Sequence, residues 1–414
     1  MTALLVALGL LMVYSASITS RPSDAGSAYL VRHLVALGVG TIVAVGAAAL
    51  PRRFWFAAAG PLFVLSCFCL LAVLLPGLGT RVNGAQRWFR FGPVGFQPSE
   101  LAKLALVLWL ARLLVKPGAR GHGFDGWLAQ PCDAGRLRSR LGFGRGVLAW
   151  RPRPLGIALL GIAVVCILVF LEPDFGTAIF LGMVGLMMLF LGGVSLLRLA
   201  LVGALAVPAV GLLIWHESYR LERITGYVKA WSSFDAAPYH VRQSLLTLGS
   251  GGVWGRGLGK GWQKLSFLPE ANTDFVFAVI GEELGLVGTL SVVALWIVLL
   301  VAGLRALRAV ASDPFASLAG FGLVGVLVSQ AAINMAVVTA LVPPKGIPLP
   351  LVSYGGTSLV VSLVAIGMLL GLTRTATASL PAGLRLDRAR PDVATAARRP
   401  ATPRKIPGPA GRLP

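Results

Sequence analysis

Asp274 stands at the junction between a polar, glycine-rich stretch and an apolar one. Residues 249–273 are rich in glycine and include tryptophans and lysines, and the residues that follow Asp274 begin a long apolar run. A carboxylate placed where water meets hydrocarbon can reach a substrate that has a polar head and an apolar tail. Asp274 is therefore the first candidate for the chemistry, although its spacing also permits it to cap the following helix.

A second group of charges opens a helix expected over residues 100–115. Pro98, Ser99 and Glu100 are typical of a helix N-terminus, so Ser99 and Glu100 are interpreted either as caps or as substrate-binding groups. Lys103 follows Glu100 by three residues and lies on the same helix face. Because an isolated charge in hydrocarbon costs about 2.5–3.5 kcal/mol, the pair is predicted to face a protein interior or a wet cavity.

Two further stretches carry charge near the expected outer face. The hairpin 171–177 reads LEPDFGT, and Asp174 is interpreted either as the cap of the next helix or as a group that orients a cation or basic side chain. The loop 342–357 reads VPPKGIPLPLVSYGGT and contains Lys345. Its prolines and glycines predict an irregular backbone, which is tolerated at membrane depth only where protein or a cavity covers it.

The stretch 247–264, TLGSGGVWGRGLGKGWQK, looks at first like a phosphate-binding loop. With Lys260 as the Walker lysine, the first glycine position falls on Trp254, so the match fails. We interpret the stretch as a segment that wraps a bulky ligand closely. Arg256, Lys260 and Lys264 would then be available to phosphate groups.

The composition identifies an integral membrane protein of the all-α class. Hydrophobic residues make up 56% of the chain and charged residues 13%, against about 25% charged in soluble domains. Ten transmembrane helices are predicted, most of them near the roughly 20 residues needed to cross hydrocarbon. Their expected ranges are 1–20, 33–50, 54–80, 100–115, 154–171, 175–197, 199–215, 275–304, 314–344 and 346–373.

Two long connections interrupt these helices. Residues 116–154 are Gly- and Arg-rich without periodicity and are predicted to form a cytoplasmic loop. Residues 217–273 are predicted to form an extracytoplasmic loop between helices 7 and 8, with an interfacial helix in its first part. Residues 1–374 are thus expected to be one membrane domain, and 375–414 a disordered basic cytoplasmic tail.

The distribution of charge predicts the topology. Lys and Arg are concentrated in the loops on the side of the C-terminus, which places both termini in the cytoplasm. The net charge is +21, but its bulk lies in juxtamembrane loops and the tail, where anionic lipids are the expected neighbours, so no nucleic-acid partner is predicted. The first 20 residues are interpreted as an uncleaved helix, because no Lys or Arg precedes their apolar run.

Six motifs together resemble the SEDS family, the shape, elongation, division and sporulation proteins, over the chain up to about residue 374. The resemblance implies a ten-helix peptidoglycan glycosyltransferase that polymerises lipid II, the undecaprenyl-pyrophosphate-linked disaccharide peptide, outside the cytoplasmic membrane. A class B penicillin-binding protein would crosslink the product. The motifs are YSAS (14–17), GAQRW with FQPSELAK (84–103), EPDFGTA (172–178), QSLLTLGSGGVWGRGLGKG (243–261), LPEANTDFVFAVIGEELG (268–285) and PLPLVSYGGTS (348–358).

The resemblance implies that Asp274 is essential, and we predict that it takes the proton from the acceptor GlcNAc 4-hydroxyl. Inversion at the donor MurNAc carbon would give a β-1,4 link. Arg87, Lys103 and Lys345 are candidates to hold the departing pyrophosphate. The predicted substrate-binding residues are Arg87, Gln97, Ser99, Glu100, Lys103, Asp174, Gln243, Lys260, Glu270, Lys345, Ser353 and Tyr354.

Some features are left open by the resemblance. Asn272 stands where histidine is usual, so no role of that imidazole is carried over. Glu100 would position Lys103, and Asp174 would support the site or bind a divalent cation, Mg²⁺ or Mn²⁺. No other cofactor is implied. Family members usually carry cytoplasmic residues before the first helix, so a start upstream of Met1 is expected.

The motifs divide between two subfamilies. GEELG, PPKG, the long loop after helix 4 and the basic tail favour FtsW, which acts in septal wall synthesis during cell division. GAQRW and PLPLVSYGG are more like RodA, which acts in elongation. FtsW is favoured and RodA is the alternative, with other divisome or elongasome membrane proteins as expected partners.

Two different functions also stay open. Ten helices with charges at membrane depth fit a transporter that flips lipid II. A transporter needs polar groups toward both faces, and Glu282 and Glu283, about two turns into helix 8, are the residues that would serve it. A scaffold for division proteins would leave the long outer loop unexplained, and it predicts that changes at Asp274 are silent in cells.

Overall fold

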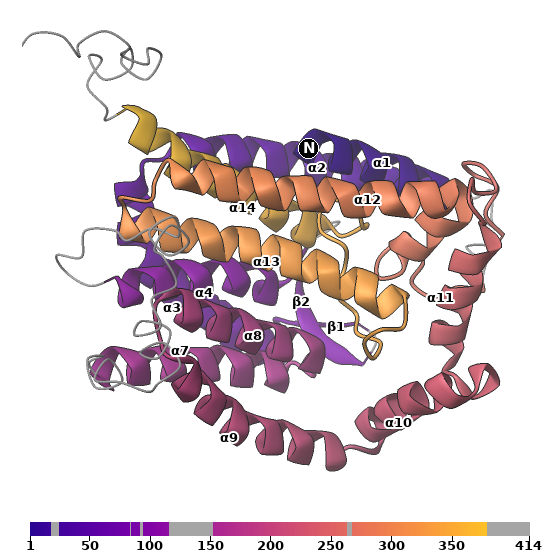
Figure 1. Ribbon diagram of the computed structural model, residues 1–414, viewed down its shortest axis with the longest axis horizontal. Helices are drawn as coiled ribbons and strands as arrows, with labels where there is room; N and C mark the ends of the chain where they lie inside the picture. The colour runs from indigo at the N-terminus through magenta and orange to yellow at the C-terminus, as the bar shows by residue number, and fades with distance from the viewer. Residues whose placement is uncertain (18–24, 83, 92–93, 116–151, 263–266, 379–414) are drawn as a thin grey trace, which may run out of the picture.

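A computed structural model describes residues 1–17, 25–82, 84–91, 94–115, 152–262 and 267–378. Most of the long helices run side by side along one direction (Figure 1). All but the last residues of the expected loop 116–154, and the tail from residue 379, lie outside the described residues. The helices are α1 (Thr2–Ser17), α2 (Ala25–Ala49), α3 (Arg52–Leu74), α4 (Pro98–Leu114), α7 (Pro152–Leu171), α8 (Phe175–Leu191), α9 (Leu196–Trp215), α10 (Ser218–Ser232), α11 (Tyr239–Ser250), α12 (Val276–Arg308), α13 (Pro314–Val338) and α14 (Gly356–Ala378), with a short 3₁₀ helix at Phe234–Ala236.

The helices confirm the membrane class predicted from composition. Seven of those in the described residues are long and apolar enough to cross a membrane, and α1 and α8 are shorter apolar helices. The tenth, α4, carries Glu100, Lys103 and Arg112. A helix therefore lies in each of the ten predicted ranges. That all ten cross the bilayer stays a prediction.

Helix α4 is the most enclosed element. It packs against α3, α7, α8, α13 and α14, and its side chains from Ala102 to Leu108 are buried. Helix α9, in contrast, has no buried residue and runs with α10 along one edge of the bundle (Figure 1). Glu100 and Lys103 of α4 therefore face protein rather than lipid.

The outer stretch after α3 departs from a purely helical fold. It forms a three-stranded antiparallel sheet in the order β1 (Thr80–Val82), β2 (Ala85–Phe91) and β3 (Val94–Phe96). Phe89 pairs with Phe96 across β2 and β3, and their rings stack with centroids 6.4 Å apart. The sheet was not predicted from the sequence, although the Asn-Gly pair at 83–84 between two short runs is typical of a hairpin. The sheet fixes Arg87 on strand β2.

The loop 342–357, here called the last outer loop after its predicted position, is irregular, as its prolines and glycines predict. The helix expected over 346–373 begins only at Gly356. Leu349, Leu351 and Val352 of the loop are buried. A Cβ at Gly9 of α1 would lie 2.7 Å from the Leu351 oxygen, so α1 packs directly on this loop. Protein therefore covers the irregular backbone.

The described part of the predicted outer segment 217–273 contains two α-helices, the short 3₁₀ helix and a glycine-rich turn at residues 251–262. Helix α10 confirms the helix predicted in its first part, and α11 packs on α12. The turn lies against α12 where that helix is interrupted at Gly285 (φ 67°, ψ −162°). The backbone oxygens of Gly252 and Val253 accept the N–H groups of Leu286 and Val287 at 2.9 and 3.2 Å.

Two glycines of this turn leave no room for a side chain against α12. A Cβ at Gly251 would lie 2.8 Å from the Glu282 oxygen, and one at Gly255 would meet the main chain of Glu283. Gly255 also has a φ of +79°, which disfavours other residues. The glycines therefore let the turn approach the backbone of α12, and the interpretation that they wrap a ligand is not needed to explain them.

Candidate active site

Asp274 lies immediately before α12 and is held through its backbone. The N-cap of α12 is Phe275, with no side-chain cap, so the interpretation of Asp274 as the cap is wrong. The Asp274 N–H donates to the Glu270 oxygen at 3.1 Å, and its own carbonyl accepts from Asn334 Nδ2 at 2.8 Å. A Cβ at Gly346 would lie 3.0 Å from Asp274 Oδ2. The backbone is thus fixed, and the half-buried carboxylate faces the last outer loop.

The surroundings of Asp274 suit a proton acceptor. The pKa of its carboxyl is raised to about 7, chiefly by burial and also by the carboxylates of Glu270 and Asp174. The guanidinium groups of Arg87 and Arg223 act in the opposite direction on this pKa. A carboxyl that exchanges its proton near neutral pH is suited to general base catalysis.

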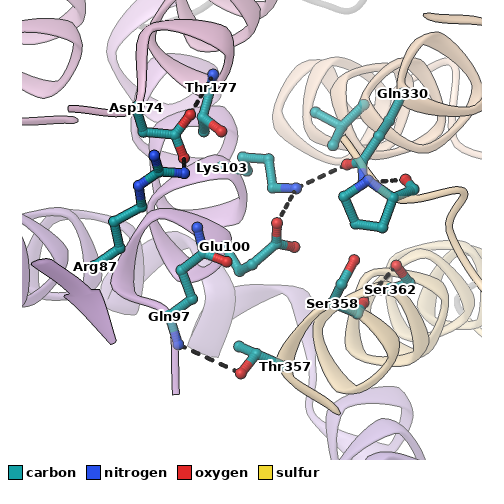
Figure 2. A network of polar contacts seen from close by, with 12 residues as sticks. Arg87, Gln97, Glu100, Lys103, Asp174, Thr177, Gln330, Thr357, Ser358 and Ser362 are labelled. Atoms are coloured by element: carbon teal, nitrogen blue, oxygen red, sulfur yellow. Dashed lines mark hydrogen bonds and ion pairs between the residues drawn. The ribbon is translucent and has the colours of Figure 1, made fainter. Parts of the chain in front are cut away.

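Lys103 and Glu100 form the ion pair predicted from their spacing (Figure 2). The Lys103 Nζ lies 2.7 Å from Glu100 Oε1 and also donates to Gln330 Oε1 at 2.7 Å. The ammonium lies 5.7 Å from the centroid of the Phe180 ring. Both charged side chains are buried, so the pair is confirmed as an interior one. Burying this pair in an apolar core costs free energy of desolvation. Buried charges that carry such a cost are typical of functional sites.

The N-terminus of α4 is tied to α14. The Gln97 N–H donates to Thr357 Oγ1 at 3.3 Å, and that hydroxyl donates to the Gly95 oxygen at 2.8 Å. The N-cap is Gln97, which makes no side-chain cap. Ser99 Oγ is buried without a hydrogen-bond partner in the described part of the chain, so Ser99 does not cap α4 either.

Both interpretations of Asp174 are correct. Its Oδ1 accepts from the Thr177 N–H at 3.1 Å and caps α8, while its Oδ2 lies 3.6 Å from Arg87 Nη1 (Figure 2). Arg87 also donates from Nη2 to the Pro173 oxygen at 3.1 Å. This ion pair therefore joins the three-stranded sheet to the hairpin between α7 and α8.

Lys345 lies beside the same hairpin. A Cβ at Gly176 would lie 3.7 Å from Lys345 Cβ and 3.8 Å from Asp174 Oδ1, which places both residues next to this glycine. Burial lowers the pKa of the Lys345 ammonium. A partly desolvated cation beside Asp174 and Arg87 is suited to bind an anion such as pyrophosphate.

Tyr354 and Ser353 shape the last outer loop. The Tyr354 N–H donates to the Asn272 oxygen at 2.8 Å, which joins this loop to the segment that carries Asp274. The Tyr354 ring packs edge-to-face on Tyr29 of α2, with centroids 5.2 Å apart. Ser353 Oγ accepts from the Leu349 N–H at 2.8 Å, so the hydroxyl stabilises the loop itself.

Gln243 and Lys260 lie apart from this group. Gln243 Nε2 donates to Tyr239 Oη at 3.3 Å within α11, and Lys260 is exposed on the glycine-rich turn. In the described part of the chain, no hydrogen bond or ion pair joins either residue to Asp274 or Lys103. Lys264 lies outside the described residues.

The carboxylates of Glu282 and Glu283 are hydrogen-bonded by other groups of the same chain. Both are fully buried, and Glu282 Oε1 accepts from the Trp262 N–H at 2.8 Å. Ser15 Oγ lies 2.7 Å from both carboxylate oxygens of Glu283 and accepts from the Gly259 N–H at 3.2 Å. The two carboxylates therefore anchor the glycine-rich turn and α1 to α12. This structural role explains the presence of the two carboxylates that a transporter would also need.

Three polar residues near the site were not predicted from the sequence. Glu172 is fully buried, and neither carboxylate oxygen has a hydrogen-bond partner among the described residues. The pKa of Glu172 is raised to about 8, chiefly by burial and also by the Asp174 carboxylate, while the Arg87 guanidinium acts in the opposite direction. Gln330 and Asn334 are buried polar residues in the otherwise apolar helix α13. Their separation of four residues, which places them on one face of a helix, is the signal in the sequence that could have found them.

No group of three or more His, Cys, Asp or Glu side chains that could hold a metal ion occurs in the described ranges. Asp174 is paired with Arg87 and so already has a cationic neighbour. A divalent cation at Asp174 therefore stays a prediction.

The fold and the site define a multi-pass membrane protein with one half-buried carboxylate and several partly desolvated cations around an irregular outer loop. A family model described as cell cycle protein, covering FtsW, RodA and SpoVE, matches residues 1–378. The chain belongs to this family, as its motifs indicated.

Individual relatives agree with this assignment. The chain is 38% identical over 370 residues to the probable peptidoglycan glycosyltransferase FtsW of Hahella chejuensis, covering 88% of this chain and 86% of that protein. It is 35% identical over 375 residues to the protein of the same name from Geobacter sulfurreducens, covering 90% and 93%.

Solved structures share the fold. A peptidoglycan synthase complex that coordinates polymerisation and crosslinking contains a chain with a TM-score of 0.67 and 29% identity, covering 91% of this chain and 96% of that one. The rod shape determining protein RodA of Thermus thermophilus has a TM-score of 0.60 and 31% identity, covering 91% and 95%.

Proposed function

We propose that this protein is a peptidoglycan glycosyltransferase of the FtsW type, which polymerises lipid II for the septal wall in cell division. The observation that carries the proposal is the setting of Asp274, whose carboxyl has a pKa of about 7 and lies near Arg87. The names of the relatives from Hahella chejuensis and Geobacter sulfurreducens support the same reaction.

In the proposed reaction, Asp274 accepts the proton of the acceptor GlcNAc 4-hydroxyl as that oxygen attacks the anomeric carbon of the donor MurNAc. The bond from that carbon to the phosphate oxygen breaks, and its electron pair leaves with the lipid pyrophosphate. Attack from the opposite side inverts the carbon and gives the β-1,4 link. Asp274 then returns its proton to water.

The cationic groups stabilise the charge that develops on the leaving group. Arg87 and Lys345 both lie beside the α7–α8 hairpin and are suited to the pyrophosphate. Lys103 is held by Glu100 and Gln330 at a buried position. Gln97, Ser99, Gln243 and Lys260 are proposed to contact more distant parts of the substrate.

The proposed setting is the cytoplasmic membrane, with both termini inside and the site at the outer face. Residues 1–374 act as one membrane domain, with the loop 116–154 inside and 217–273 outside, and the basic residues of 375–414 contact anionic lipid. A class B penicillin-binding protein is the proposed partner, which the similarity to a peptidoglycan synthase complex supports.

The test is polymerisation of labelled lipid II by the purified protein together with its cognate class B penicillin-binding protein. Wild type is expected to make glycan strands, and Asp274→Asn none, with folding and complex formation intact. Asp235→Asn changes an exposed carboxylate of the same outer segment and should leave the activity unchanged. If both Asp274 forms instead move lipid II across vesicles without polymerising it, the protein is a transporter and the proposal is wrong.

A complementation experiment separates the two cellular roles. The proposal predicts that this chain restores septation in cells depleted of FtsW but does not restore rod shape in cells depleted of RodA. Restoration of rod shape alone would assign the protein to elongation.

A further inference from the structure

Two buried amides on successive turns of α13 face the last outer loop. Gln330 is 2% exposed and Asn334 is 1% exposed. Residues four apart lie on the same face of a helix, about 6 Å from each other along its axis. The two side chains are therefore held by one rigid element at a fixed separation.

Each amide joins that loop to a different charged residue of the site. Gln330 Nε2 donates to the Pro348 oxygen at 3.0 Å, and its Oε1 accepts from Lys103 Nζ at 2.7 Å (Figure 2). Asn334 Nδ2 donates to the Ile347 oxygen and to the Asp274 oxygen, both at 2.8 Å. Both hydrogens of the Asn334 amide are thus used, one for each carbonyl.

We propose that Gln330 and Asn334 are positioning residues that set the separation between the Lys103 ammonium and the Asp274 carboxylate. The proposal rests on the proposed function, in which Lys103 faces the leaving group and Asp274 the attacking hydroxyl. Asn334 binds the carbonyl of Ile347, and Gln330 binds the adjacent carbonyl of Pro348. The same two residues of the loop therefore hold both amides.

The hydrogen-bonding pattern favours positioning over core filling. Asn334 Oδ1 is buried without a hydrogen-bond partner in the described part of the chain, and such a group costs about 1–3 kcal/mol. A leucine would avoid this cost. The amide is therefore retained for the two bonds that its nitrogen donates.

The separation between the Lys103 ammonium and the Asp274 carboxylate matters because the reaction needs the attacking hydroxyl and the leaving group in line. A displacement of about 1 Å between reacting groups can reduce a rate by about 100-fold. Lys103 and Asp274 lie on different elements, α4 and the start of α12, and α13 contacts both through these amides. A fixed pair of contacts on α13 removes the independent movement of the two charges.

The first test concerns Gln330 and Lys103. In the polymerisation assay with the partner protein, we expect Gln330→Leu to lower kcat by about 10- to 100-fold with little change in KM. In a Lys103→Met background, the same change should have almost no further effect, since Gln330 acts through Lys103. Additive losses in the double variant would overturn the proposal for Gln330.

A conservative variant keeps this test informative if Gln330→Leu does not fold. Gln330→Glu retains an oxygen that accepts from the Lys103 ammonium, replaces the donor to Pro348 with an acceptor and adds a negative charge beside that ammonium. It is expected to keep at least ten times the activity of the leucine variant, or to be active where that variant fails to fold. Gln330→Glu that folds but is inactive would contradict a role through Lys103.

The second test concerns Asn334 and the pH dependence of the rate. Without the Asn334 amide, the Asp274 backbone is released and its carboxylate becomes more hydrated. The acidic limb of the pH–rate profile should then move to lower pH by about half a unit or more in Asn334→Leu and in the smaller Asn334→Ser. A loss of activity with the limb unchanged in both variants would indicate a structural role only.

A matched control is available on the same helix. Ser329 Oγ donates to the Gly325 oxygen at 2.5 Å, within α13 itself. Ser329→Ala should leave the rate and the pH profile unchanged, and its effect should be the same in the Lys103→Met background.

If the wild-type complex makes no glycan strands, the proposed function fails and this proposal with it. If wild type is active but the losses are additive and the pH profile is constant, this proposal alone fails.

Discussion

The Arg87 guanidinium lies 3.6 Å from the Asp174 carboxylate and joins strand β2 to the first turn of α8. The same carboxylate caps α8 by accepting the Thr177 N–H at 3.1 Å. One side chain thus caps the N-terminus of a helix and holds a cation beside the site. The two roles use different oxygens, so they can be separated by substitution.

Substitutions at Asp174 separate the cap from the charge. Asn caps helices as well as Asp does, so Asp174→Asn should change the free energy of unfolding by less than about 1 kcal/mol, whereas Asp174→Ala should cost about 1 kcal/mol or more. Both variants should lose at least about ten-fold in polymerisation, because Arg87 loses its anionic partner. Thermal unfolding and the lipid II assay measure the two effects. Full activity in Asp174→Asn would limit Asp174 to a capping role.

Polymerisation should depend on the ionisation of Asp274. The folded pKa is raised to about 7, and only the ionised carboxylate accepts a proton, so the rate should rise as the pH increases through about 7. The Glu270 carboxylate contributes to this raised pKa. Glu270→Gln should therefore move the acidic limb to lower pH. Glu217→Gln, an exposed neutralisation on the same outer segment, is the control, and an equal movement in both variants would contradict the assignment.

Glu172 should destabilise the protein at high pH. Its folded pKa is raised from 4.5 to about 8, so the folded state favours the protonated carboxyl. The stability that this preference contributes is fully present below about pH 4.5 and is lost as the pH rises through about 8. Glu172→Gln stays neutral, so it should raise the melting temperature at pH 9 and have little effect at pH 4.5. A gain that is equal at both pH values would show that ionisation is not its cause.

Removal of Lys103 should affect stability and activity through different routes. Lys103→Met leaves the buried Glu100 carboxylate without its cation, which should cost about 3–5 kcal/mol. Adding Glu100→Gln removes the uncompensated charge and should recover most of that stability without recovering polymerisation. Thermal unfolding and the lipid II assay on the single and double variants test this. Recovery of activity in the double variant would exclude a role for the ammonium in the reaction.

The glycine-rich turn offers a test of its packing on α12. Gly252 and Gly255 both have a positive φ, at 59° and 79°, so alanine at either position carries the backbone cost of about 1–2 kcal/mol. Only at Gly255 would the new Cβ also meet the main chain of Glu283. Gly255→Ala should therefore lower the melting temperature clearly more than Gly252→Ala, and should expose the turn to proteolysis. Equal effects would mean that the close approach is not needed.

Local patterns in the sequence were sufficient for the class and for several pairs. A chain with 56% hydrophobic residues has too little charge for a soluble surface, so the membrane class follows from composition. The Glu100–Lys103 pair and the cap at Asp174 depend on separations of three residues, which a single helical turn determines. The irregular last outer loop followed from its prolines and glycines, which exclude a continuous helix.

Tertiary structure decided which distant groups meet. Lys103 and Gln330 are 227 residues apart, and Asp274 and Asn334 are 60 apart. In lipid, an apolar helix face gains little by packing on one neighbour rather than another, so hydrophobic periodicity does not reveal which faces pair. Close packing and hydrogen bonds between helices make that choice, and they depend on the whole arrangement. The sequence alone therefore determined the class, the helices and the candidate carboxylate, whereas only the folded chain decided that α13 joins Asp274 to Lys103.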